Sequence, residues 1–455
     1  MTVHRMLSSI VASAALAASV LLAASPAAAA AGAAPVQTET PTPAPTPTAT
    51  PPPIPDDPTD PVRAQEYWLD GARIRDAWRV TRGEGVTIAI IDTGIGEPPV
   101  MFDRAVAGGT DVSGNGSADG RTPVGPLNVN HGTWVASVAA GRGNPDGTGM
   151  IGVAPEAELL SVSLGFGASA AVPFVDQVAE AMHWAVDHGA DVINLSFTTN
   201  TLDWDESWDE AFLYAFDHDV VVIVAAGNRR SGTSIVGAPA TIPGVLTVGG
   251  VDQTGTASLD ASTQGITIGI SAPSESLLGM SADGTLVTWD GTSGAAPIVA
   301  GAAALVRAAH PDLDAVGVIN RLIRTAIPVP EMRSAPDVLY GYGLLDANAA
   351  VTASVPEARV NPMGDLRDWI RVHRRAASPS EPEPTAAPAP GAVPPLPAAD
   401  PPSAPGSPLL PSEETLRYGT LPLLALTVPG IVIALGVTAA ARRIRTERGR
   451  RTPIP

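Results

Sequence analysis

The chain has 455 residues and contains neither cysteine nor lysine. The absence of cysteine excludes a disulfide framework, a thiolate zinc site and a thiol nucleophile. The absence of lysine excludes a P-loop lysine, a Schiff-base enzyme and a serine–lysine dyad. All 27 basic residues are therefore arginines, and several classes of enzyme are ruled out before any motif is considered.

Basic residues are also few beside the 46 aspartates and glutamates, and the net charge is −19. Six of the arginines lie between residues 442 and 451, so the rest of the chain is more acidic than the total suggests. Proteins that bind nucleic acid present basic grooves to its phosphates. We therefore expect no nucleic-acid partner, and the basic C-terminal tail needs a different explanation.

Residues 1–30 have the pattern of a secretory signal peptide. His4 and Arg5 precede an apolar, alanine-rich run over 6–24, and small residues suited to cleavage follow it. The apolar run is longer than usual and its basic part is thin, so an uncleaved anchor is the alternative. The sequence predicts an exported protein.

Residues 419–441 have the pattern of a transmembrane helix. These 23 residues carry no charge, and a helix of that length spans a hydrocarbon core of about 30 Å. A buried core helix is the alternative, but it would not stand between a proline-rich stretch and an arginine cluster. By the positive-inside rule the tail 442–455 stays cytoplasmic. We expect a single-pass cell-membrane protein with its acidic body outside the cell.

Two proline-rich blocks, a linker over 31–61 and a stalk over 377–418, flank the part of the chain that can fold. They have too little apolar surface to form a core and are typical of disordered or polyproline spacers. The folded domain is therefore expected over 62–376, held away from the bilayer by the stalk.

Within this domain, short apolar runs alternate with helical stretches. The strands are expected at 86–92, 159–163, 192–197, 220–225 and 245–249, and the helices at 135–140, 172–188, 206–218 and 295–310. Such alternation predicts an α/β fold with a parallel sheet covered by helices on both faces, a three-layer α/β/α arrangement. Sheets of this kind place their chemistry at the carboxyl ends of the strands.

Three reactive side chains stand at strand ends or helix starts. Asp92 follows a buried strand, His131 precedes a helix, and Ser293 enters a long apolar helix. Taken alone, each has a structural explanation: a turn, a satisfied histidine and an N-cap. Taken together, they are the groups that activate a hydroxyl, because an imidazole must accept its proton and a carboxylate must orient the imidazole.

Asn228 adds a fourth group at the end of another buried strand. Its amide can donate a hydrogen bond to a developing oxyanion, alongside the backbone N–H of Ser293 at the start of a helix. The alternative is that Asn228 only builds a turn.

At these residues the chain resembles the subtilase family of serine peptidases. The resemblance rests on the ordered motifs IIDTG (90–94), NHGTWVASVAAG (130–141), VINLS (192–196), AAGN (225–228) and GTSGAAPIVAGAAALV (291–306). Their Asp, His, Ser order is that of subtilisin. The resemblance implies a subtilisin-like fold in which Asp92 orients, His131 is the base, Ser293 is the nucleophile and Asn228 is the oxyanion donor, without a cofactor.

The same resemblance implies how substrate is bound. One segment would pair with the substrate backbone: Ser196, Phe197 and Thr198. Others would line the pocket for the side chain before the cut: Ala225, Ala226 and Gly227, with 237–239. Many subtilases have glycine at position 198, and Asp290 replaces a residue that often bears an amide.

The overall plan, with its signal, stalk and C-terminal span, resembles the mycosins, membrane-anchored subtilases of type VII secretion systems. Mycosins commonly carry disulfides, which this chain cannot form. The resemblance implies an extracellular serine endopeptidase acting on a protein or peptide, with a type VII membrane complex as partner. The alternative is a structural scaffold of that complex with dispensable proteolysis. A lipase or esterase is disfavoured, since the Gly-x-Ser-x-Gly elbow is missing.

Calcium is the remaining question, because subtilases often bind it. The acidic run 203–210 has no recognisable ligand spacing, so no metal is predicted. We interpret that run as solvated surface leading into a helix, or as a mobile loop at the rim of the cleft.

Overall fold

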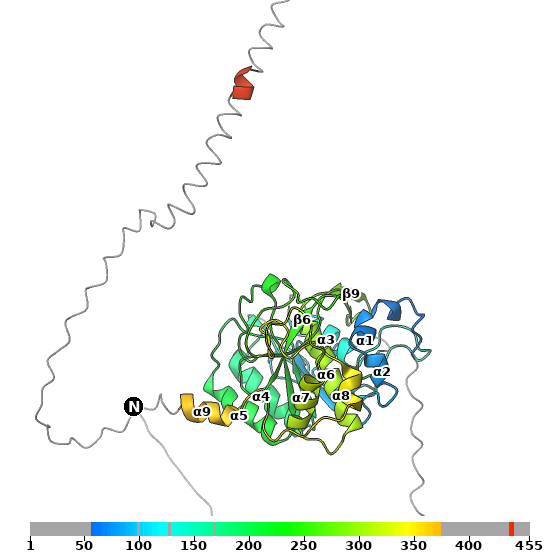
Figure 1. Ribbon diagram of the computed structural model, residues 1–455, viewed down its shortest axis with the longest axis vertical. Helices are drawn as coiled ribbons and strands as arrows, with labels where there is room; N and C mark the ends of the chain where they lie inside the picture. Colours follow the sequence, from blue (N-terminus) through cyan, green and yellow to red (C-terminus); the bar gives the residue numbers. More distant parts are fainter. Residues whose placement is uncertain are drawn as a thin grey trace, which may run out of the picture. The chain divides into compact units, whose positions relative to one another are not determined.

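The computed structural model describes residues 56–97, 101–102, 104–125, 129–167, 170–374 and 436–440 (Figure 1). All the named helices and strands lie in the first of two compact units, residues 1–378, and the second comprises 379–455. The predicted signal peptide, the linker up to residue 55, the whole stalk and the basic tail lie outside the described residues. So does the predicted span 419–441, apart from the helical residues 436–440.

A parallel sheet of seven strands, in the order β2-β3-β1-β4-β5-β6-β7, forms the middle layer. The strands are β1 (Thr87–Asp92), β2 (Val106–Asp111), β3 (Glu158–Ser163), β4 (Val192–Leu195), β5 (Val221–Ala225), β6 (Leu246–Val251) and β7 (Ile268–Pro273). β4 and β5 are fully buried, as expected for continuous apolar runs covered on both faces. β2 and β7 were not predicted, because glycine, serine and proline weaken the strand pattern of these two edge strands.

Helices cover both faces of the sheet, which confirms the predicted three-layer α/β/α fold. One face packs α3 (His131–Ala140), α6 (Thr292–Ala309), α7 (Ala315–Arg324) and α8 (Ala347–Thr352), together with α1 (Tyr67–Gly71) and α2 (Ile74–Ala77). The other face packs α4 (Phe174–Asp187), α5 (Glu206–Asp217) and α9 (Leu366–His373). In Figure 1 the labels of the second group stand to the left of those of the first.

The helix α6 runs through the core of the first group. It is rich in alanine, glycine and valine, and residues Gly294 to Val306 are all buried. Among the described residues, α6 is the one helix long and apolar enough to cross a membrane, and it lies mostly inside the folded unit. A two-stranded antiparallel ribbon of β8 (Leu277–Met280) and β9 (Leu286–Trp289) leads into it.

The acidic run 203–210 is only partly the solvated surface that we expected. Asp205 caps α5 by accepting a hydrogen bond from the Ser207 N–H, so the predicted helix start is present. Trp204 and Trp208, however, are buried and pack into the hydrophobic core on the α4 and α5 side of the sheet. The indole N–H of Trp204 donates to the buried carboxylate of Asp209.

The N-terminal end of the described chain packs beyond the predicted domain boundary at residue 62. Asp56 forms ion pairs with Arg63 and Arg75, and the backbone N–H of Gly149 donates to Asp60.

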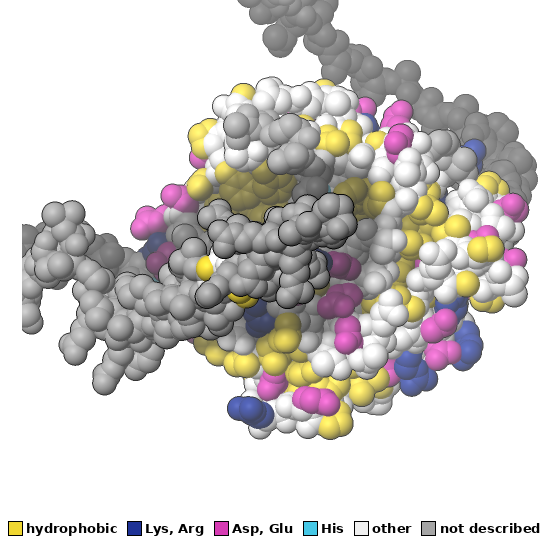
Figure 2. All heavy atoms as spheres, turned by 90° about the horizontal axis from the view of Figure 1, so that it is seen from above, with side chains coloured by type: hydrophobic (Ala, Val, Ile, Leu, Met, Phe, Trp, Pro, Cys, Tyr) yellow, Lys and Arg dark blue, Asp and Glu magenta, His cyan; other side chains and the backbone are white. Residues whose placement is uncertain are grey.

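On the surface, the face seen in Figure 2 shows broad hydrophobic patches, with basic groups in small separate areas beside acidic ones.

Candidate active site

The four predicted reactive residues converge at the carboxyl edge of the sheet. Asp92 ends β1, Asn228 follows β5, His131 begins α3 and Ser293 stands in the first turn of α6. His131, Asn228 and Ser293 line one cleft with a volume of about 570 Å³. Asp92 lies fully buried behind His131. The strand order brings Asp92 and Asn228 close together, because β1 and β5 lie in the middle of the sheet with only β4 between them.

Asp92 holds the imidazole of His131. The Nδ1 atom lies 2.8 Å and 3.0 Å from the two carboxylate oxygens, and the Thr93 N–H donates to the same carboxylate. An ionised carboxylate can only accept, so Nδ1 donates and Nε2 is left toward the cleft. Burial acts to lower the pKa of His131, but the charge of Asp92 and its hydrogen bond together raise that pKa above the usual 6.5.

The hydroxyl of Ser293 is held by Ser196, the residue that follows strand β4. It donates to the backbone carbonyl of Ser196 (2.9 Å), and the Ser196 hydroxyl donates to the backbone carbonyl of Ser293 (2.9 Å). The buried amide of Asn194 donates to the Ser196 hydroxyl (2.8 Å). To give its proton to His131, the Ser293 hydroxyl would turn from Ser196 toward Nε2, since catalytic hydrogen bonds often form only once substrate is bound.

The amide of Asn228 is oriented by Thr292, a residue that the sequence interpretation did not single out. The Asn228 carbonyl oxygen accepts from the Thr292 N–H (2.7 Å) and hydroxyl (2.9 Å), and that hydroxyl accepts from the Gly227 N–H. With its oxygen engaged, the amide has its NH₂ group left to donate. Gly291 has a φ of +139°, and a Cβ there would lie 2.8 Å from the amide nitrogen. The sequence offered one indication of this role, because Thr292 directly precedes the predicted nucleophile Ser293.

The two ends of the cleft differ in chemistry. Beside His131 stand Trp134 and Trp289, with ring centroids 6.3 Å and 5.7 Å from the imidazole. Neither tryptophan was predicted, although Trp134 lies one helical turn after His131. At the other end stand residues that were predicted to bind substrate: Ser196, Phe197, Thr198, Ala225 and Gly227, joined by Thr233.

One predicted pocket residue, Ala226, and one predicted segment, 237–239, do not line this cleft. The side chain of Ala226 is buried in the hydrophobic core between the sheet and α4 and α5, because side chains alternate between the two faces along a strand end. Residues 237–239 are buried too, and Gly237 meets the cleft only through the hydroxyl of Thr198, which donates to its carbonyl. For calcium, the described residues offer no cluster of carboxylates that could hold a metal ion.

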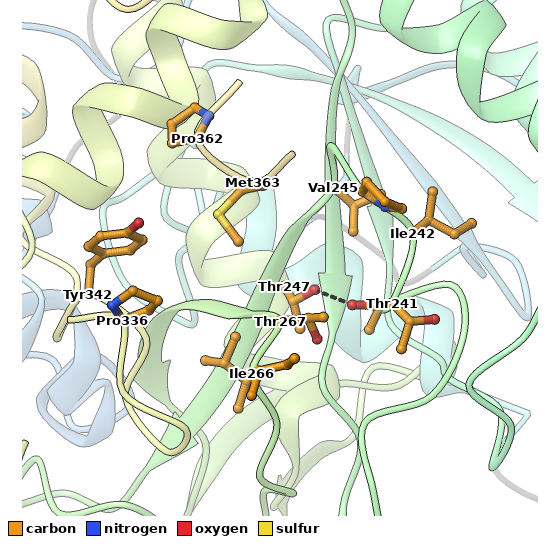
Figure 3. A pocket seen from close by; sticks show the side chains of 13 residues that line it. Thr241, Ile242, Val245, Thr247, Ile266, Thr267, Pro336, Tyr342, Pro362 and Met363 are labelled. Carbon is orange, nitrogen blue, oxygen red and sulfur yellow. Dashed lines mark hydrogen bonds between the residues drawn. The ribbon is translucent and has the colours of Figure 1, made fainter. Parts of the chain in front are cut away.

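A second cavity of about 200 Å³ lies beside β6 and β7 (Figure 3). Its lining is apolar and hydroxylic, with Pro336, Tyr342 and Met363 facing Thr241 and Thr247. The Thr247 hydroxyl donates to the backbone carbonyl of Ala240. None of the thirteen lining residues is an acid, a histidine or a predicted site residue, so this cavity lacks the groups for acid–base chemistry.

The comparisons with known proteins agree with this geometry. The sequence pattern of the subtilase family, peptidase S8, matches residues 83–343. Mycosin-4 of Mycobacterium tuberculosis is 33% identical, over 63% of this chain and 69% of its own. Subtilisin DY of Bacillus licheniformis is also 33% identical, over 64% of this chain and 94% of its own. The chain belongs to the subtilase family and is a serine endopeptidase, as the sequence predicted.

Among solved structures, the MycP3 protease from the type VII (ESX-3) secretion system is similar to this chain. It is 33% identical, with a TM-score of 0.54, and the match covers 63% of this chain and 88% of that one. The predicted resemblance to mycosins is therefore confirmed, and so is the subtilisin-like fold.

Proposed function

We propose that this subtilase cleaves peptide bonds with Ser293 as nucleophile, His131 as base and Asp92 as the orienting acid. The observation that carries the proposal is the bond from Nδ1 of His131 to buried Asp92, with Ser293 in the same cleft. Asp92 holds the tautomer in which Nε2 can accept a proton, and its charge stabilises the imidazolium that forms.

Catalysis then runs through an acyl-enzyme. The Ser293 oxygen attacks the peptide carbonyl while its proton passes to Nε2 of His131. The negative oxygen of the tetrahedral intermediate is stabilised by the Asn228 amide and by the Ser293 N–H in the first turn of α6. The intermediate collapses when His131 protonates the leaving amine. Water activated by His131 then hydrolyses the ester, which restores the serine hydroxyl.

Labelling with a fluorophosphonate tests the nucleophile. The purified full-length chain should be labelled on Ser293, and Ser293→Ala should abolish both labelling and peptide hydrolysis. Ser231→Ala is the matched control, since Ser231 is an exposed serine that lines the same cleft. Labelling of any other residue, or hydrolysis that survives in Ser293→Ala, would contradict the assignment.

We further propose that the chain is anchored by a single span in the cell membrane, with the peptidase domain outside and the C-terminus inside. The apolar runs at 1–30 and 419–441 and the arginines of the tail support this topology. Protease added to intact cells should cut in the stalk 377–418 and leave a small membrane stub. A domain that stays protected from external protease would reverse the orientation.

The similarity to MycP3, a protease from a type VII secretion system, supports association with type VII protein secretion. Whether catalysis or scaffolding serves secretion can be separated by two variants. Ser293→Ala removes one hydroxyl, which donates to the backbone carbonyl of Ser196, whereas deletion of 62–376 removes every contact surface. We expect the point variant to lose cleavage and still secrete, and the deletion to lose secretion. Disassembly of the complex by Ser293→Ala alone would show that catalysis is needed for assembly.

A further inference from the structure

The proposed chemistry determines which end of the cleft receives which half of the substrate. His131 must protonate the leaving amine, so the leaving half lies on the side of His131, Trp134 and Trp289. The side chain next to the attacked carbonyl, on the acyl half, then lies on the other side of Ser293. That end is formed by Ser196 to Thr198 on one wall and by Gly227 and Thr233 on the other.

Two threonines, one from each wall, bring their methyl groups together at Gly227. A Cβ on Gly227 would lie 2.7 Å from the Cγ2 methyl of Thr198 and 2.6 Å from the Cγ2 methyl of Thr233. Both methyl groups therefore pack against the same face of Gly227, directly before Asn228. A glycine at position 198 would remove one of these two methyl groups.

Hydrogen bonding fixes the Thr198 side chain in this position. Its hydroxyl donates to the Gly237 carbonyl at 2.8 Å, and the Ala238 carbonyl lies at 3.3 Å. The bond ties Thr198 to the buried segment behind its own wall, so the side chain is held in place from outside the cleft. Since Thr198 is β-branched and stiff about χ1, its methyl cannot turn away while the hydroxyl stays bound.

We propose that Thr198 and Thr233 restrict cleavage to peptides with a small side chain, alanine, glycine or serine, immediately before the cut. The inference rests on the proposed function, because it uses the same nucleophile and base. Selectivity arises by exclusion: a leucine or phenylalanine side chain meets the two methyl groups before its carbonyl can reach the Asn228 amide.

Paired peptide substrates test the inference. Two peptides, identical except for Ala or Phe before the cut, are compared by kcat/KM with the purified full-length chain. The wild type should favour Ala by at least about 10-fold. Thr198→Gly should shift the Phe-to-Ala ratio upward by roughly 10- to 200-fold, the range that a few buried atoms command in a specificity pocket. Thr233→Ala should shift it in the same direction.

Thr199→Gly is the matched control. It makes the same backbone change one residue along, but its hydroxyl bonds to Thr201 and its side chain does not line the cleft. Its ratio should equal that of the wild type. Thr198→Ala keeps a Cβ and replaces Thr198→Gly if the glycine variant does not fold.

Fluorophosphonate labelling of Ser293 separates the two ways of failing. If Ser293 is labelled and the wild type prefers Phe, or Thr198→Gly leaves the ratio unchanged, the pocket inference is wrong and the catalytic proposal stands. If Ser293 is neither labelled nor needed for hydrolysis, the proposed function is wrong and the inference falls with it.

Discussion

On one face of the sheet α3 and α6 are buried on almost every side, whereas on the other face α4 and α5 bury one stripe each. Small residues permit the first arrangement: a Cβ on Gly301 of α6 would lie 2.5 Å from the Val153 side chain and 3.0 Å from the Ala139 carbonyl of α3. In α5 the buried residues recur every three or four positions, as in an amphipathic surface helix.

The difference explains where the chemistry lies. His131 and Ser293 both stand in the first turns of the fully packed helices, so neighbours on all sides fix the positions of their backbones. The helices of the other face cover the sheet and contribute no side chain of the triad. Substitutions on the first face should therefore change turnover, and substitutions on the second should change stability.

The largest effect on turnover is expected at the triad residues at the starts of α3 and α6. Ser293→Ala and His131→Ala should each lower kcat by about 10⁶, and the double variant should be hardly worse, because the triad acts as a unit. Steady-state hydrolysis of a peptide substrate measures the loss, and circular dichroism should show an unchanged fold. Losses that add in the double variant would mean that the two residues do not act together.

Asp92→Asn should lower kcat by about 10⁴, because the imidazole loses the carboxylate that fixes its tautomer. It should also move the pH profile. In the wild type, kcat/KM should rise as pH increases through a His131 pKa above 6.5, since the neutral base is the active form. Without the Asp92 charge, burial alone acts and lowers this pKa, so the rise should shift to lower pH. A shift to higher pH would contradict the stated cause.

The third effect is expected on the face of the sheet covered by α4 and α5, and it concerns the stability of the fold. Phe212 on α5 is fully buried, so Phe212→Ala should lower the free energy of unfolding by about 3–5 kcal/mol. Urea denaturation measures it, and kcat should stay unchanged at a temperature where the variant is folded. Glu210→Ala on the exposed side of the same helix should change stability by less than about 0.5 kcal/mol. A lowered kcat in folded Phe212→Ala would break the contrast between the faces.

Asn228→Ala should lower kcat by about 10²–10³ with little change in KM, since the amide acts on the oxyanion and not on the bound substrate. Steady-state kinetics with one peptide substrate measures kcat and KM separately. An increase in KM alone would assign Asn228 to substrate binding.

The smallest effect is expected at Thr292, which acts through Asn228. Thr292→Val keeps the shape but loses the hydroxyl between the Gly227 N–H and the Asn228 carbonyl, so kcat should fall by about 10-fold. Thr292→Ser keeps the hydroxyl and should restore activity. If both variants lose activity equally, the hydroxyl is not the positioning group. In an Asn228→Ala background, Thr292→Val should cost little more.

The predicted strands and helices were found where the apolar pattern was continuous, as in β1, β4 and β5. The edge strands β2 and β7 were missed, because their pairing with β3 and β6 outweighs a weak local preference. The start of α6 was placed at 295, yet the helix begins at Thr292. Local propensity disfavours glycine, serine and threonine in a helix, and packing of α6 against β4 and β5 overrides it.

The sequence by itself determined the reactive groups, their order and the alternating fold. Motifs such as 90–94 and 291–306 are contiguous, so each can be recognised from neighbouring residues alone. Only the tertiary structure decided what those groups touch. The bonds from Thr292 to Asn228 and from Thr198 to Gly237 join residues 64 and 39 positions apart. Ala226 turned into the core although its neighbours line the cleft. The direction of a side chain depends on packing from several segments at once, and no single stretch of sequence contains that information.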